Sequence, residues 1–197
     1  MRRIAHLTAL LLAIAAFGAL ASEAEVRAAS VEAVEDGLVL NADFEFALSQ
    51  RLEEVVASGV PLYFRVEFEM TRPRWYWFDE KAVAGVLQLR LSYHALSRSY
   101  RLSSGLLQQN FATLEEALNV LKRVRNWLVV DRTVTFADSD YEAAVRLRLD
   151  TGMLPKPFQL SALTSRELQL ESAWKRFTVR PRQVPAPVES RNPQGGR

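Results

Sequence analysis

The chain has 197 residues, of which 49% are hydrophobic and 10% aromatic, and its 25 Lys and Arg residues nearly balance 23 Asp and Glu residues. This length and composition predict one folded domain with appendages. The chain contains no cysteine, which excludes disulfide frameworks, thiolate zinc sites, iron–sulfur clusters and cysteine nucleophiles.

Residues 1–21 have the features of a secretory signal peptide. Arg2 and Arg3 precede an apolar run from Leu7 to Leu20, the order found in cleavable leaders. The run has about fourteen residues, fewer than the roughly 20 that cross a bilayer. We therefore expect cleavage after Ala21 and a periplasmic or secreted product, with a retained membrane anchor as the alternative. Because the two arginines are the only charged residues of the leader, the remaining chain is formally neutral, and its charge gives no reason to expect nucleic acid as a partner.

The C-terminal residues 181–197 are rich in proline and glycine and contain no apolar side chain larger than valine. Such a segment buries too little surface to offset the entropy of ordering, so we expect a disordered tail. Residues 22–180 contain no linker or repeat, and we expect them to form a single β-rich domain.

Several stretches of this domain alternate apolar and polar residues with a period of two, as strands with one buried and one solvated face do. They are Leu38–Leu48, Leu62–Met70, Val83–Tyr93 and Tyr141–Leu149. The dipeptide Asp36-Gly37 predicts a hairpin turn before the first of them. Clean alternation of this kind is typical of antiparallel sheet.

Two stretches between the strands predict helices. Ser49–Ser58 ends at a glycine and a proline. Leu114–Leu128 follows a capping-box spacing of Thr113 and Glu116 and has an apolar stripe at helical spacing. A short helical turn is expected near Thr164, before a last strand. The predicted fold class is α+β: a mainly antiparallel sheet of about seven or eight strands, sandwich-like or a partial barrel, with one long amphipathic helix and one or two short helices.

Residues suited to catalysis or metal binding are few. His94 is the single histidine outside the leader, and no nucleophile-elbow sequence accompanies it. Asp138-Ser139-Asp140 lacks the other ligands of a calcium loop, so a turn is the expected structure. The spacing of Ser172 and Lys175 matches an S-x-x-K motif, but its context reads as strand, where positions three apart face opposite sides. We expect no metal and no cofactor.

Glu67 and Glu69 project from the same face of a predicted strand. A pair of carboxylates could cleave glycosides, which makes a carboxylate hydrolase of the envelope an alternative function. Arg65 and Arg90 on neighbouring solvated positions favour ordinary surface ion pairs instead.

The segment from Arg72 to Lys81 contains four consecutive aromatic residues beside two arginines. An extended chain cannot turn all of them to one core, so they either cover the core from two sides or form a platform for a peptide, glycan or partner protein. The candidate binding residues of this segment are Arg72, Arg74, Trp75, Tyr76, Trp77 and Phe78.

Lys156 is a further candidate binding residue. It lies between Pro155 and Pro157, which are expected to hold an extended crossing between strands and to leave Lys156 facing solvent or a partner.

Together with the leader and the aromatic segment, several motifs resemble a family of exported proteobacterial proteins of unknown function. They are Tyr100-Arg101-Leu102-Ser103, the stretch from Phe111 to Leu118, Val124-Arg125-Asn126-Trp127, Leu147-Arg148-Leu149-Asp150 and the stretch from Leu154 to Phe158. The resemblance covers most of residues 25–180 and implies an exported single-domain protein of a Gram-negative bacterium, with no activity attached. It also implies an association with genes for a nitrogen-regulation-type sensor kinase pair.

The leading functional hypothesis is a non-enzymatic periplasmic binding or protein-interaction module, accessory to an envelope-sensing system. Its partner would be a protein, peptide or glycan of the cell envelope, and a membrane only if the leader is retained. Besides the carboxylate hydrolase, the remaining alternative is a carrier of an apolar ligand. Such a carrier needs an internal cavity, which tight packing of Phe44, Phe64, Phe68 and Leu89 would exclude.

Overall fold

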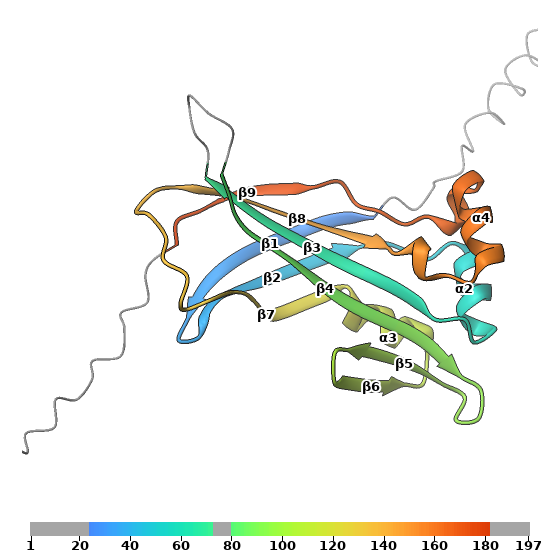
Figure 1. The fold of residues 1–197 in the computed structure, drawn as a ribbon. Coiled ribbons are helices and arrows are strands. Elements are labelled where there is room, and N and C mark those ends of the chain that lie inside the picture. The colour runs from blue at the N-terminus through green and yellow to red at the C-terminus, as the bar shows by residue number, and fades with distance from the viewer. Residues whose placement is uncertain (1–23, 73–79, 182–197) are drawn as a thin grey trace, which may run out of the picture.

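The structure is a computed structural model that describes residues 24–72 and 80–181. The predicted signal peptide, the predicted C-terminal tail and most of the aromatic segment lie outside these ranges. Nine strands form two antiparallel sheets in the described part of the chain, so the α+β prediction is confirmed (Figure 1).

The smaller sheet has three strands in the order β1-β2-β7. Their bounds are Glu25–Val34 for β1, Gly37–Glu45 for β2 and Arg123–Asp131 for β7. The predicted hairpin turn between β1 and β2 is present but lies one residue earlier than expected: Glu35 and Asp36 form it, and the register pairs Val34 with Gly37.

The larger sheet has six strands in the order β6-β5-β4-β3-β8-β9. Their bounds are Leu62–Arg72 for β3, Glu80–His94 for β4, Ser99–Ser104 for β5, Leu107–Phe111 for β6, Tyr141–Leu149 for β8 and Lys175–Val179 for β9. The central strand β3 is buried at every second residue, from Leu62 to Met70. The predicted alternation is therefore present in the structure.

The two sheets face each other as an unclosed sandwich. A parallel bridge between Ala24 and Ser172 joins them at one edge, so that β1 lies beside β9. The core between them is formed by inward side chains of β2, β3 and β8, among them Leu40, Phe64, Phe68, Val145 and Leu147. Burying such side chains is the main stabilising contribution to the fold.

The described residues also form three α-helices and two 3-10 turns, which lie at the ends of the strands (Figure 1). Helix α2 (Gln50–Ala57) is capped by Ser49, whose Oγ accepts a hydrogen bond from the Leu52 amide. Helix α3 (Leu114–Leu121) has the predicted capping box of Thr113 and Glu116. Turns η1 (Thr151–Met153) and η2 (Arg166–Leu168) flank helix α4 (Lys156–Thr164). No helix of the described residues is long and apolar enough to cross a membrane.

The predicted long helix from Leu114 to Leu128 is wrong in its second half. The helix ends at Leu121, and β7 begins at Arg123. The residues from Val124 to Val130 follow no clean period of two, and backbone pairing with β2, with two register shifts, selects the strand.

The prediction of an extended crossing at residues 154–158 is also wrong. Helix α4 begins at Lys156, with Pro155 at its N-cap and Pro157 in its first turn. Proline suits the first turn of a helix because the amide it lacks has no partner within the helix there. Lys156 is exposed, as predicted.

Candidate functional site

The predicted binding residues are not brought together by the described structure. Arg72 ends β3 and stands opposite Glu80 of β4, whereas Lys156 begins α4 at the other end of the molecule (Figure 1). The others lie outside the described residues, and their role stays a prediction: Arg74, Trp75, Tyr76, Trp77 and Phe78.

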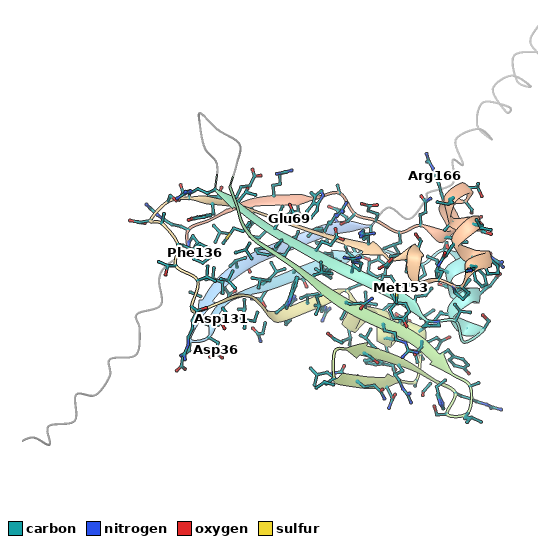
Figure 2. The ribbon with its side chains drawn as sticks, in the orientation of Figure 1. Asp36, Glu69, Asp131, Phe136, Met153 and Arg166 are labelled. Atoms are coloured by element: carbon teal, nitrogen blue, oxygen red, sulfur yellow. The ribbon has the colours of Figure 1, made fainter. Side chains whose placement is uncertain are left out.

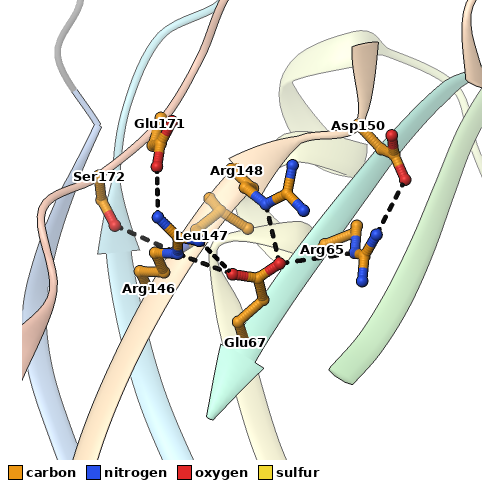
Figure 3. Close-up of polar contacts among 8 residues, drawn as sticks. All are labelled: Arg65, Glu67, Arg146, Leu147, Arg148, Asp150, Glu171 and Ser172. Carbon is orange, nitrogen blue, oxygen red and sulfur yellow. Dashed lines mark hydrogen bonds and ion pairs between the residues drawn. The ribbon is translucent and has the colours of Figure 1, made fainter. Parts of the chain in front are cut away.

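A different group of side chains gathers on the outer face of the six-stranded sheet (Figure 3). Because alternate residues of β3 point to the core, Arg65 and Glu67 point outward. Register places Arg65 opposite Arg148 and Glu67 opposite Arg146 on β8. We call this group, with two neighbouring acids, the Glu67 cluster: Arg65, Glu67, Arg146, Arg148, Asp150 and Glu171.

Glu67 stands at the centre of the cluster, with only 12% of its side chain exposed. Nε and Nη2 of Arg146 both lie 2.7 Å from its Oε2. On the other oxygen, Oε1, Arg148 Nε lies at 2.8 Å and Arg65 Nε at 3.7 Å. One carboxylate therefore holds three guanidinium groups, two by hydrogen bonds.

The charge of Glu67 is secured by these contacts. Burial by itself raises the pKa of the Glu67 carboxyl, but hydrogen bonds from Arg148 and Arg146 and the attraction of their charges lower the pKa further than burial raises it. The net shift is downward, so Glu67 is a fixed anion at neutral pH. It is unsuited to donate a proton as a general acid, which needs a raised pKa.

The neighbouring acids and one indole fix the arginines from the outside. Arg146 Nη1 lies 2.6 Å from Glu171 Oε1, and its guanidinium carbon lies 4.5 Å from the centre of the Trp174 ring. Arg65 Nη1 lies 3.4 Å from Asp150 Oδ2. Contacts within the chain thus hold Arg65 and Arg146 in place, and side chains held in this way lose less conformational entropy when they contact another group.

Two arginine side chains on this face keep donors that are not engaged by acids of the described chain. Arg148 contacts Glu67 through Nε alone, and its terminal nitrogens point away from that carboxylate (Figure 3). Arg90 of β4 lies over the ring of Tyr63, 5.9 Å from its centre, and forms no ion pair within the described residues. The guanidinium fork of arginine matches carboxylates and phosphates in two-point contacts.

A surface groove of ≈ 590 Å³ has Arg90 in its lining and lies between the face of β4 and the turn that joins β5 to β6. Its lining combines polar and cationic groups with exposed apolar side chains, namely Tyr63, Gln88, Arg90, Val86, Leu106 and Leu107. The groove therefore has a cationic group and apolar side chains next to each other.

The geometry gives no support to the carboxylate hydrolase. Glu67 is held by arginines, and Asp138 and Asp140 are exposed and both contact Arg180. His94 lies at a turn with its Nδ1 3.0 Å from Ser97 Oγ, and it contacts no carboxylate among the described residues. The described residues contain no group of three His, Cys, Asp or Glu suited to hold a metal ion.

The S-x-x-K spacing has no catalytic geometry either. Ser172 Oγ accepts a hydrogen bond from the Leu147 amide at 3.0 Å, whereas Lys175 Nζ donates to the Arg27 carbonyl. The geometry therefore indicates that the match of Ser172 and Lys175 to an S-x-x-K motif is a chance match.

The apolar carrier is likewise unsupported, because the side chains named as obstacles fill the interior. Phe44, Phe64, Phe68 and Leu89 are all buried. Phe64 stacks on Phe46 and Phe68 meets Trp127 edge-on.

Comparison with known protein families supplies the relationship of the chain. A family model described as a domain of unknown function (DUF4390) matches residues 21–178. The chain belongs to this DUF4390 family. No curated protein and no solved structure matches it. Membership agrees with the predicted resemblance to a family without known function, and the DUF4390 domain coincides with the two sheets described above.

Sequence reasoning found Arg65 and Glu67 but missed their partners Arg146, Arg148, Asp150 and Glu171. A signal was present in the DUF4390 domain: Arg146 and Arg148 occupy successive polar positions of the alternating strand Tyr141–Leu149, and Asp150 follows it. Two like charges on one strand face are stabilised by opposite charges on the neighbouring strand.

Proposed function

We propose that the chain is a non-enzymatic binding module of the cell envelope, whose outer sheet face holds an acidic segment of a partner protein. The proposal is carried by two arginines, Arg90 and Arg148, on the outer face of the sheet. Each has guanidinium N–H donors that no acid of the described residues engages, and Glu67 holds Arg148 in place. The rim of the adjoining groove adds apolar contacts from Leu106 and Leu107. Arginine and aromatic residues are enriched among the anchors of protein interfaces.

Sequence features support the location in this proposal. Arg2, Arg3 and the apolar run that follows favour export, with cleavage after Ala21. The resemblance to exported proteins that are associated with sensor kinase genes supports an accessory role in envelope sensing. The partner would then be a protein of the envelope.

Selection of peptides from a random display library on the full chain tests the ligand chemistry. We expect the recovered peptides to be enriched in Asp and Glu next to apolar residues, and their binding to weaken with rising salt. The double variant Arg90→Gln/Arg148→Gln should bind them about a hundredfold or more weakly, since each of the two lost charge-assisted contacts contributes roughly 1.5–3 kcal/mol.

The matched control is Arg27→Gln/Arg123→Gln, which removes the same charge from the three-stranded sheet and should bind as the wild type does. Arg90→Gln alone keeps the test valid if loss of Arg148 weakens the fold. Peptides without acidic enrichment, or equal binding by the Arg90/Arg148 variant, would refute the proposed face. In the same assay, Trp75→Ala/Trp77→Ala tests the aromatic segment predicted from the sequence.

A further inference from the structure

Helix α4 exposes large apolar side chains at one end of the sandwich. Leu160 and Leu163 are 70% and 80% exposed, and Met153 just before the helix is also exposed. Residues three apart lie on the same helical face. Figure 2 shows Met153 and Arg166 at this same end. Single exposed leucines are common, but a cluster on one face marks a contact surface.

Basic residues flank this apolar face. Lys156 lies one helical turn before Leu160, and Arg166 follows the helix; both are exposed. Lysine and arginine beside exposed apolar side chains can contact the headgroups of an anionic bilayer while the apolar side chains enter its interface. With nine residues, α4 can lie on a membrane but is too short to cross one.

The first described residue lies close to α4. The Gln169 side-chain amide donates to the carbonyl of Ala162 in α4 at 2.6 Å, and three residues later Ser172 forms the bridge with Ala24. Three extended residues span about 10 Å. The apolar run of the leader ends at Leu20, only four residues before Ala24. A bilayer that holds this run is therefore within reach of α4.

We propose that α4 is a membrane-contacting element of the leader-bearing chain. Leu160 and Leu163 enter the lipid interface, and Lys156 and Arg166 contact anionic headgroups. The apolar run acts as a tether that raises the local concentration of α4 at the bilayer, so a small contact area is sufficient. This inference concerns the chain before the cleavage expected after Ala21, while the leader is still attached. It rests on the insertion of the leader that the proposed export requires, and it is independent of the arginine face.

The absence of cysteine makes a direct test possible, because a single introduced cysteine is labelled uniquely. The full chain with Leu160→Cys or Leu163→Cys is labelled with an environment-sensitive fluorophore and reconstituted in vesicles of phosphatidylcholine and phosphatidylglycerol. Leu106→Cys is the matched control, since Leu106 is fully exposed on the turn between β5 and β6. Nitroxide-bearing lipids then report contact of each label with the bilayer.

We expect lipid quenching at positions 160 and 163 to be roughly threefold or more above that at position 106, and to decrease with Lys156→Glu or without the anionic lipid. Equal quenching at positions 160 and 106 would overturn the inference. So would a blue-shifted label at 160 that lipid nitroxides do not quench, because protein and not lipid would then cover α4. If the chain does not float with the vesicles in a density gradient, the leader has not inserted, and the proposed export is contradicted too. If the chain floats but the labels on α4 are not quenched, only the inference about α4 fails.

Discussion

Glu67 carries a negative charge where little of its side chain reaches water, and three arginines surround it. An isolated buried carboxylate would be costly, and so would three adjacent guanidinium groups without their anion. The polar outer face of the sheet therefore depends on this one residue more than on any other member of the Glu67 cluster.

We predict that Glu67→Gln lowers the free energy of unfolding by about 2–3 kcal/mol, because it leaves Arg146 and Arg148 partly buried beside a neutral amide. Urea unfolding followed by circular dichroism measures the change. Glu171→Gln is the matched control: it removes one partner of Arg146 at a position that is 55% exposed, and it should cost roughly 0.5 kcal/mol. Equal effects of the two substitutions would contradict the central role of Glu67.

The stability that Glu67 contributes should depend on pH in one direction. Its pKa in the folded chain is below the ordinary value of 4.5, so the folded state favours the ionised form. The contribution is complete above the unfolded pKa and is lost as the pH falls through the folded pKa. The difference in unfolding free energy between wild type and Glu67→Gln should thus be constant near neutrality and shrink below pH 4.5.

The members of the Glu67 cluster show what a sequence can predict about a site. The outward direction of Arg65 and Glu67 followed from alternation within one strand. Their partners on β8 are 79 and 81 residues away from Glu67, and no local pattern specifies which strands become neighbours or in which register. Ion pairing was foreseen with Arg65 as a partner, but the partners of Glu67 on β8 were not.

At the scale of elements, alternation with a period of two identified β2, β3, β4 and β8 correctly because each has one buried and one solvated face. It failed after Leu121, where Val124 and Leu128 have helical spacing and the residues from Trp127 to Val130 form an apolar run without alternation. Val124, Leu128 and Val130 lie within a strand because β2 offers an edge for backbone pairing. The local sequence pattern cannot predict this pairing, because β2 and β7 are far apart in the chain.

The turn between β1 and β2 gives a prediction about the stability of the fold. Gly37 has φ +143, and a Cβ there would lie 2.0 Å from the carbonyl oxygen of Val130 in β7. Gly37→Ala must therefore displace β7 or break the hairpin, and we expect a loss of roughly 2–4 kcal/mol in unfolding free energy.

Gly105→Ala is the control for this substitution. Gly105 also has a positive φ, of +56, but a Cβ would meet open space there. Only the backbone strain of roughly 1–2 kcal/mol should then be seen. Thermal unfolding compares the two variants, and a Gly105 effect as large as that of Gly37 would show that crowding against β7 is not the cause.

At the scale of the whole molecule, the two sheets lie next to each other at one edge, where a single bridge connects them but no ladder of backbone hydrogen bonds forms among the described residues. Both β1 and β9 are edge strands of their sheets, and beyond the bridge of Ala24 and Ser172 they lie side by side unpaired. Free strand edges invite pairing with other chains, and proteins often protect them with a charged residue that points inward. The register of β9 places Lys175 opposite the buried Val145, so Lys175 points to the inner side.

We therefore predict that Lys175 prevents strands of other chains from pairing with the edge where β1 and β9 meet. Its Nζ donates to the carbonyl of Arg27 on β1 at 3.2 Å and thus occupies a backbone group that another strand would otherwise use. Lys175→Thr removes the positive charge and the long side chain that reaches the Arg27 carbonyl, and threonine still favours a strand. We expect it to raise the apparent mass with concentration in size-exclusion chromatography with light scattering. Arg176→Thr changes the adjacent residue, which pairs with Glu142 on the outer face, and should leave the mass as in the wild type. If both variants behave alike, the edge is protected by its twist or its length, and Lys175 is an ordinary surface cation.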